Sequence, residues 1–265
     1  MLLEYTEKMI ERKLAVTQPY FFPYLGFFQL INLVDFIVIL DVVQFKKRNW
    51  MCRNRIIHPD ESKDFLYISL PIRKPSYLKK IKEVYIVDDC CWKEEILRKI
   101  NAIYRKSPFF KEIYEVLLEC FNIRSNKYLD VVIHTLKVVC SYLDISWKFS
   151  FLSKMDLQLP KIEGPGDWSL YIAKKLGFNI YINLPKGIYI YDNEKFKRNG
   201  IFLYFLYPKL QKYFQLKKRF ISHLSIIDVM MMNHKDKVKD MIKNDFVLLT
   251  SKELLDNINK GTINL

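Results

Sequence analysis

The sequence predicts an α/β protein with a mainly parallel sheet, built on an N-terminal strand–loop–helix–strand unit. A short apolar run at residues 13–19 ends at a proline and predicts the first strand. Residues 24–34 are apolar at most positions, which indicates a buried helix, and residues 35–41 are rich in β-branched side chains, which indicates a central strand. A single helix is the shortest crossover, so we expect residues 13–17 and 36–40 to be adjacent parallel strands.

The rest of the chain continues the α/β pattern around a helical middle segment. Residues 44–55 form a polar stretch. We expect strands at residues 65–72, 83–88, 147–153, 179–184, 187–192 and 200–208. We expect helices at residues 92–104, 109–121 and 128–143, a helix that ends at Gly177, and another that begins within residues 223–233. The expected organisation is an N-terminal core (13–91), a helical insertion or small subdomain (92–145) and a C-terminal part (146–265) that completes the same domain.

The charge of the chain leaves two interpretations open. The 265 residues carry a formal net charge of +14, and 50% of them are hydrophobic. A polyanionic partner such as nucleic acid would explain the charge. A lysine-rich solvated surface would explain it equally, since the composition is biased towards Lys, Ile, Asn, Tyr and Phe as a whole. We give the solvated surface the greater weight and rank nucleic acid second.

Cysteine and histidine usage predicts a reduced, cytoplasmic protein without a metal site. The five cysteines include no C-x-x-C pair, and the four histidines are scattered without ligand spacing. The N-terminus mixes charged residues into its apolar positions, unlike a signal peptide. We expect no membrane span, because no uninterrupted apolar run reaches about 18 residues. The sequence assigns no cofactor.

Polar residues gather after the two N-terminal strands, at the edge where parallel sheets bind their ligands. Gln18 follows the first strand and Asp41 the second, and we take these two as the candidate catalytic residues. Three roles are open to Asp41: it can bind a sugar hydroxyl, act as a base or hold a metal. The stretch after Asp41 supplies candidate ligand-binding side chains, which are Gln44, Lys46, Lys47, Arg48, Asn49, Arg53, Asn54 and Arg55. Arginine binds phosphate or carboxylate with paired donors. The alternative is that Gln18 and Asp41 cap loops and that the basic run is solvated.

Two further side chains are candidates for substrate binding. Trp50 could stack on a base or sugar, or could instead cover an edge of the core. Asp228 lies in an otherwise apolar helical turn and needs a partner if it is buried, while Ser225 is a natural N-cap for that helix. The turn-rich loop at residues 162–168 opens a helix and offers backbone N–H groups to an anion, which is a weak signal.

Residues 18–56, "QPYFFPYLGFFQLINLVDFIVILDVVQFKKRNWMCRNRI", resemble the opening signature of the WbqC-like family. The family pattern is approximately Q-P-x-Y-F-P, G-Y-F, D-x-F-V, L-D-x-x-Q-F and W-x-x-R-N-x-I. The matching positions in this chain are Gln18, Pro19, Pro23, Gly26, Asp35, Asp41, Gln44, Phe45, Trp50, Arg53, Asn54 and Ile56. Later segments, among them "YISLPI", "GIYIYDNEKF", "GIFLYFLYP" and "LSIIDVMMMN", are similar to later parts of the family.

The resemblance implies a cytoplasmic protein of bacteria or archaea that is linked to O-antigen, lipopolysaccharide and other surface-polysaccharide gene clusters. Its best concrete expectation is an acyl or aminoacyl transferase that acts on a nucleotide-linked amino sugar. Arg53 and Arg55 would then hold the diphosphate, and Gln18, Gln44 and Asn54 would bind the sugar. Two alternatives stay open: a basic nucleic-acid-binding protein with Trp50 stacked on bases, and a non-catalytic assembly factor of a polysaccharide machine.

Overall fold

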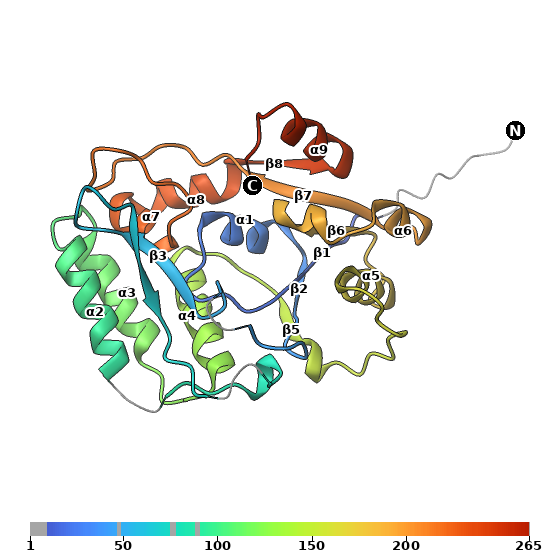
Figure 1. Cartoon of the computed structure of the whole chain (residues 1–265), viewed down its shortest axis with the longest axis horizontal. Coiled ribbons are helices and arrows are strands. Elements are labelled where there is room, and N and C mark those ends of the chain that lie inside the picture. The colour runs from blue at the N-terminus through green and yellow to red at the C-terminus, as the bar shows by residue number, and fades with distance from the viewer. Residues whose placement is uncertain (1–9, 47–48, 75–77, 88–90, 265) are drawn as a thin grey trace, which may run out of the picture.

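The computed structural model describes residues 10–46, 49–74, 78–87 and 91–264. Its centre is a six-stranded sheet in the order β5-β2-β1-β6-β7-β8 (Figure 1). The strands are β1 (Lys13–Thr17), β2 (Phe36–Ile39), β5 (Phe149–Phe151), β6 (Ile180–Asn183), β7 (Phe202–Pro208) and β8 (Phe246–Thr250). All neighbours are parallel except β7 and β8, so the expected α/β architecture with a mainly parallel sheet is confirmed.

The N-terminal unit folds as its sequence predicts. β1 and β2 are adjacent and parallel, with Leu14 opposite Phe36 and Thr17 opposite Ile39. The helix between them is α1 (Leu25–Leu33), in which seven of the nine residues are buried. Because β1, β2, β5, β6 and β7 run in the same direction, their carboxyl ends lie along one edge of the sheet.

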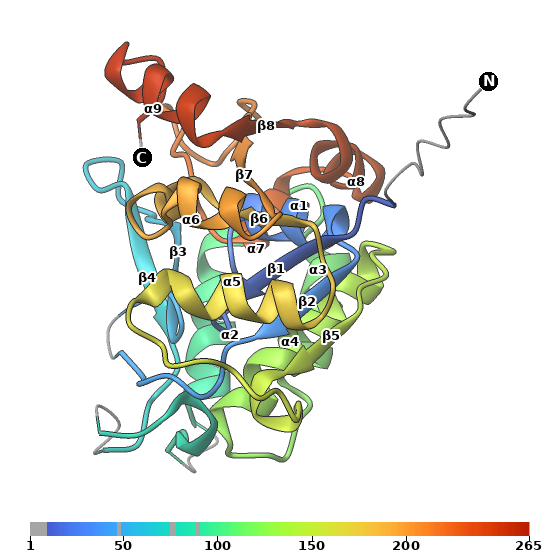
Figure 2. The same cartoon turned by 90° about the vertical axis from the view of Figure 1, so that its right-hand side faces the viewer.

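Both faces of the sheet are covered, as is usual for parallel strands. Along β1, Ala15 packs into one hydrophobic cluster while Leu14 and Val16 pack into a second one on the opposite face. The first cluster contains side chains of α1, α7 (Ile226–Met232) and α8 (Lys235–Asn244), and the second contains side chains of α5 (Pro165–Lys175), α6 (Asn193–Arg198) and α9 (Ser251–Asn259). Figure 2 shows α5 lying across its face of the sheet.

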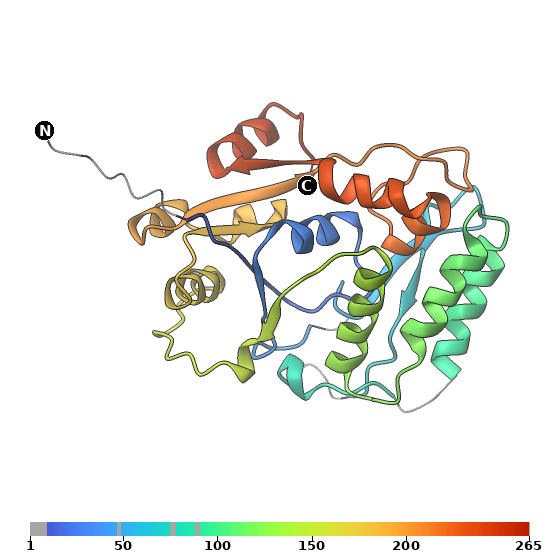
Figure 3. The same ribbon diagram turned by 180° about the vertical axis from the view of Figure 1, so that it is seen from behind.

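A helical layer extends the first face. It consists of α2 (Cys91–Tyr104), α3 (Phe110–Phe121) and α4 (Tyr128–Tyr142) (Figure 3). The buried side chains of these helices belong to the same cluster as those of α1. A separate two-stranded antiparallel sheet, β3 (Arg53–Ile57) with β4 (Phe65–Ser69), packs beside these helices. Across the described ranges, every helix is too short or too polar to span a bilayer.

Three expected elements differ from the structure. Residues 53–55, the end of the expected polar stretch, form β3 together with residues 56 and 57, since Asn54 and Ile56 alternate with outward-facing arginines. In place of a strand at 83–88, the described residues form a 3-10 turn (Ile81–Glu83) followed by isolated bridges at Tyr85 and Ile86, and Asp88 lies outside the described residues. In place of a strand at 187–192 there is a 3-10 helix (Pro185–Tyr189), favoured by a proline at its first position.

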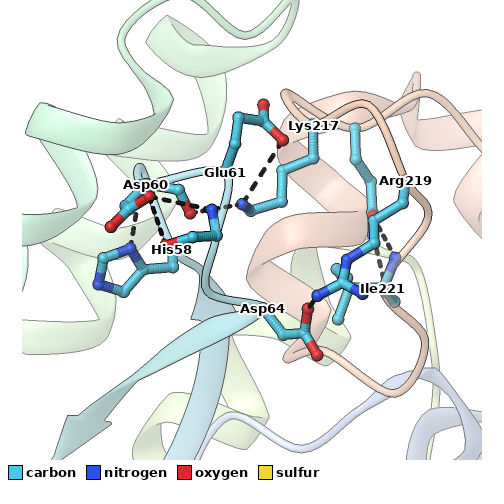
Figure 4. A network of polar contacts seen from close by, with 9 residues as sticks. His58, Asp60, Glu61, Asp64, Lys217, Arg219 and Ile221 are labelled. Carbon is cyan, nitrogen blue, oxygen red and sulfur yellow. Dashed lines mark hydrogen bonds and ion pairs between the residues drawn. The ribbon is translucent and has the colours of Figure 1, made fainter.

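Residues 209–225, the linking segment, join β7 to α7 and reach back to the turn between β3 and β4 (Figure 4). The ammonium of Lys217 donates to the carbonyl of Asp60 at 2.8 Å and lies 3.9 Å from the carboxylate of Glu61. Arg219 pairs with the carboxylate of Asp64. These contacts fix the linking segment against the β3–β4 hairpin.

Candidate functional site

The loop between β1 and α1, residues 18–24, is clamped from inside the protein. Phe21 and Phe22 are fully buried, and Phe22 has a positive φ of 40°, a conformation that costs free energy in a residue with a side chain. The side-chain amide of Asn54 donates to the carbonyls of Phe21 (3.2 Å) and Phe22 (2.7 Å). Ser225 Oγ donates to the same Phe22 carbonyl at 2.8 Å. These donors offset the strain and set the course of the loop.

Further hydrogen bonds hold both prolines of the loop. The hydroxyl of Tyr128 lies within hydrogen-bond distance of two carbonyl oxygens, those of Pro19 (3.2 Å) and Met51 (2.8 Å). The N–H of Ile226 donates to the carbonyl of Pro23 at 2.8 Å. The phenylalanines and prolines of "QPYFFPY" therefore build a rigid turn. Between them, Tyr20 and Tyr24 remain partly exposed.

Tyr20 and Tyr24 belong to a group of aromatic and basic side chains that we call the switch-point cluster. Its members are Tyr20, Tyr24, Trp50, Arg55, Lys186 and His223. The ring centroids of Tyr20 and Trp50 are 6.4 Å apart, and those of Tyr24 and His223 are 5.6 Å apart. The guanidinium of Arg55 lies 5.0 Å from the centroid of Trp50 and donates to the carbonyl of His223 at 3.0 Å. Trp50 is 38% exposed, so this cluster faces solvent.

The cluster carries positive charge that the protein leaves uncompensated. Ion pairs within the described residues involve neither Arg55 nor Lys186. Partial burial, then the charges of Arg55 and Lys186, lower the pKa of His223, which keeps its imidazole neutral at pH 7. Arg55 Nε is buried and has no hydrogen-bond partner in the described part of the chain. An unpaired buried N–H costs about 1–3 kcal/mol.

The two tyrosines are neutral under ordinary conditions. Desolvation by burial raises the pKa of Tyr20, with a further increase from neighbouring Tyr24 and a decrease from Arg55. Burial also raises the pKa of Tyr24. Both hydroxyls can therefore donate a hydrogen bond to an anionic ligand without losing their protons.

The cluster lies where a parallel sheet offers a crevice. β1 and β6 are adjacent parallel strands, but the chain leaves them towards opposite faces. After β1 it enters α1, whose Phe27 and Phe28 lie in the first hydrophobic cluster, and after β6 it reaches α6, whose Phe196 lies in the second. Lys186 lies three residues after the end of β6, and Tyr20 lies three residues after the end of β1. This is a topological switch point, the usual ligand site of open α/β sheets.

The structure places Asp41 at the carboxyl end of β2, away from solvent. Asp41 is 1% exposed, and its carboxylate accepts hydrogen bonds from the backbone N–H of Ser153 (2.9 Å) and from the Ser153 hydroxyl. Gln18 is partly buried, and its side chain makes no hydrogen bond within the described residues, whereas Gln44 and Lys46 are exposed. Lys47 and Arg48 lie outside the described residues. Asp41 thus joins the ends of β2 and β5.

The other predicted side chains divide between the site and the core. Arg53 and Arg55 are two residues apart on β3 and point to the same side, where Arg53 stacks at 4.2 Å on Tyr67. Asn54 points inward and holds the loop after β1. Trp50 and Arg55 thus lie in the cluster, while the amide of Asn54 is engaged by backbone carbonyls.

Asp228 is buried at the start of α7 and has the partners that its burial requires. Its carboxylate accepts from the hydroxyls of Tyr104 (2.7 Å) and Tyr213 (2.6 Å) and from the amide of Gln215 (2.9 Å). Burial raises the pKa of Asp228, although the three donors act in the opposite direction. Ser225 caps α7 as expected, by accepting from the N–H of Ile227. Asp228 ties α2, α7 and the linking segment together.

Sequence reasoning did not select Tyr20, Tyr24, Lys186 or His223. The two tyrosines stand within the N-terminal signature, and the rule that sites follow strand ends would also have indicated Lys186. No sequence signal indicates His223, which reaches Arg55 from 168 residues away. Among the described residues, no three His, Cys, Asp or Glu side chains are placed to share a metal ion.

The fold and the cluster define an α/β protein with a group of basic and aromatic side chains at the switch point of a mainly parallel sheet. The chain belongs to the WbqC-like protein family, whose model matches residues 18–240. It is 27% identical over 222 residues to the uncharacterized protein Rv1507c of Mycobacterium tuberculosis. The aligned region covers 83% of this chain and 93% of Rv1507c. No solved structure matches the chain.

Proposed function

We propose that this protein is an enzyme of surface-polysaccharide biosynthesis, of the O-antigen type, that transfers an acyl or aminoacyl group to a nucleotide-linked amino sugar. The observation that carries the proposal is the incompletely paired guanidinium of Arg55, which lies beside Trp50 and His223 at the switch point. The charge of Lys186 acts on the same histidine. Cations without acidic partners, next to aromatic faces, suit a diphosphate attached to a sugar and a base. Membership in the WbqC-like family supports the same assignment.

In this proposal each group of the cluster has a distinct role. Arg55 and Lys186 bind the diphosphate, and Arg53 adds a further cation from the same side of β3. Trp50 and Tyr20 stack on the base or the sugar. Gln18, with its free amide at the end of β1, hydrogen-bonds a sugar hydroxyl. Gln44 and Lys46, which are exposed, would contact the outer part of the ligand.

The transfer step requires one proton acceptor. The amino nitrogen of the sugar attacks the carbonyl carbon of the donor, an N–C bond forms, and the bond between that carbon and the leaving group breaks. The proton of the nitrogen passes to a base and then to the leaving group. His223 is suited to this role because its lowered pKa keeps it neutral. Asp41 is the other candidate, although Ser153 would first have to release its carboxylate.

Calorimetric titration with UDP-N-acetylglucosamine tests the site directly. We expect Arg55→Gln to weaken binding at least roughly tenfold, since a charge-assisted hydrogen bond contributes about 1.5–3 kcal/mol. The matched control is Arg105→Gln, which removes an exposed arginine that makes no ion pair within the described ranges.

The control should bind within about twofold of the wild type. Equal weakening by both variants would show that only the overall charge matters. Binding of mixed-sequence RNA at moderate salt, without nucleotide-sugar binding by the wild type, would favour the nucleic-acid alternative, because RNA affinity falls steeply with salt.

A further inference from the structure

A basic hollow is lined by residues other than those of the switch-point cluster. It has a volume of about 420 Å³ and is lined by Arg73, Lys74, Lys79, Tyr85 and Asn126, none of which belongs to the cluster. This volume falls within the roughly 300–1,000 Å³ of ordinary small-molecule sites. Its lining is polar rather than apolar, which favours a charged ligand.

The backbone that carries these side chains is fixed by hydrogen bonds between three segments. The N–H of Arg73 donates to the carbonyl of Tyr85 at 2.9 Å, and the N–H of Ile86 donates to the carbonyl of Asn126 at 2.9 Å. Bridges join Ile72 to Ile86 and Tyr85 to Lys127. Four of the lining residues thus come from residues 73–85, and Asn126 joins them from a distant part of the chain.

The side chains that line the hollow can donate hydrogen bonds but carry no carboxylate. Arginine, lysine, the tyrosine hydroxyl and the asparagine amide all supply N–H or O–H groups. Ion pairs in the described part of the chain involve none of Arg73, Lys74 and Lys79. The neighbouring carboxylate of Glu83 is engaged, since it accepts from the N–H of Lys80 at 3.1 Å.

The hollow is connected to the carboxyl edge of the main sheet. The N–H of Phe45 donates to the carbonyl of Lys79, and the N–H of Lys82 donates to the carbonyl of Asp41. Residues 79–82 thus run beside the loop that follows β2. A ligand in the hollow would lie next to the strand end that carries Asp41.

We propose that this hollow is a second binding site, for a compact ligand that carries two or more phosphate groups. Three cations within a small volume match the charge of a diphosphate or triphosphate, and the tyrosine and asparagine donors supply further contacts. The inference goes beyond the proposed function, because it concerns a different set of residues and a second ligand.

Calorimetry on the whole chain with inorganic tripolyphosphate tests the proposal. The titration is done on the Arg55→Gln protein, in which the main cation of the switch-point cluster is removed. We expect the affinity of the hollow for tripolyphosphate in this protein to be within about twofold of its affinity in the wild type. Adding Arg73→Ala and Lys79→Ala should weaken it at least roughly tenfold, the loss expected for one charge-assisted contact or more. The control pair, Arg105→Ala with Lys106→Ala, removes one arginine and one lysine from exposed positions elsewhere and should change it by less than twofold.

A charge-conserving variant, Arg73→Lys with Lys79→Arg, should keep most of the affinity. Thermal unfolding midpoints of the alanine variants equal to that of the Arg55→Gln protein would show that their loss of affinity does not come from unfolding. ADP that binds more tightly than inorganic diphosphate would identify a nucleotide site, and equal affinities would identify the phosphate chain as the recognised group. Equal losses in the alanine pair and the control pair, or no binding to the Arg55→Gln protein, would overturn the proposal. The proposal for the switch-point cluster is tested separately, because it would be contradicted if the wild type did not bind the nucleotide sugar.

Discussion

Phe22 shows how single residues position the candidate site. A buried phenylalanine with a positive φ is held only because Asn54 and Ser225 both donate to its carbonyl. The strained turn brings Tyr20 and Tyr24 to the surface on either side of buried side chains. A site built in this way needs no ordering when a ligand binds, and this preorganisation preserves binding free energy.

Asp41 and Ser153 form a pair whose role can be determined by comparing two variants. If Asp41 only joins the ends of β2 and β5, Asp41→Asn and Ser153→Ala should each lower the free energy of unfolding by about 1–3 kcal/mol, because each breaks hydrogen bonds at a buried carboxylate. Urea unfolding measures this. Transfer activity that survives Ser153→Ala but disappears in a stable Asp41→Asn protein would instead make Asp41 the base.

Asp228 should make stability depend on pH in a defined direction. Its pKa in the folded protein is raised above the ordinary 3.8 by burial, so the folded state retains a proton that the unfolded state has lost. Its contribution to the free energy of unfolding therefore falls as pH rises from 3.8 through the raised pKa. We expect the wild type to lose stability relative to Asp228→Asn between pH 4 and pH 7, measured by urea unfolding. The opposite trend would mean that the three donors outweigh burial.

At the scale of elements, α1 packs closely on the carboxyl end of β7, and a glycine permits this approach. A Cβ atom at Gly26 would lie 2.5 Å from Cγ of Pro208 and 2.6 Å from Cε2 of Tyr24. The proline ring cannot move aside as a flexible side chain would. The position of Tyr24 in the cluster therefore depends on a helix that approaches the sheet without a side chain in between.

Gly26→Ala should destabilise the protein and disturb the site. Overpacking costs about 1–3 kcal/mol, whereas alanine returns at most about 1 kcal/mol of helix propensity, so a net loss is expected. Gly164→Ala is the control for added volume, because a Cβ there meets no atom within 4 Å. Gly164 is the N-cap of α5, so alanine should cost no more than about 1 kcal/mol there. Thermal unfolding and nucleotide-sugar titration of both variants measure the effect, and equal midpoints would contradict it.

At the scale of the whole molecule, the linking segment determines whether the cluster is complete. It carries His223 and is held to the β3–β4 turn by Lys217 and Arg219. The side chain of Lys217 is 1% exposed, whereas that of Arg219 is 63% exposed. Only the buried contact should contribute much to holding the segment, because exposed ion pairs contribute about 0–1 kcal/mol.

Lys217→Ala should therefore loosen the linking segment more than Arg219→Ala does. We expect faster hydrogen exchange in residues 209–225 and weaker nucleotide-sugar binding for the lysine variant, because its buried stem and its bond to the Asp60 carbonyl are both lost. The arginine variant serves as the control and should differ from the wild type by less than about 1 kcal/mol in stability. Equal exchange rates in the two variants would contradict this hierarchy.

The sequence predicts those elements that depend on a local pattern of residues. It does not predict elements or site residues that depend on partners far away in the chain. The β1–α1–β2 unit was predictable because one helix joins two apolar runs. β3 was missed because its buried Asn54 looks polar until the carbonyls of Phe21 and Phe22 are in place. Trp50 and Arg55 were accessible from the N-terminal signature, but Lys186 and His223 join them only after the sheet has brought separate parts of the chain together.

The pairing of β1 with β6 has a consequence for synthesis on the ribosome. Val16 and Tyr181, which meet across this pair, are 165 residues apart. At about 5–20 residues per second, β1 waits on the order of ten seconds before β6 is made. During that time β1 can pair with β2 on one side only, and its other edge remains open to unrelated chains. A nascent chain shorter than β6 is thus the species most exposed to aggregation and most dependent on chaperones.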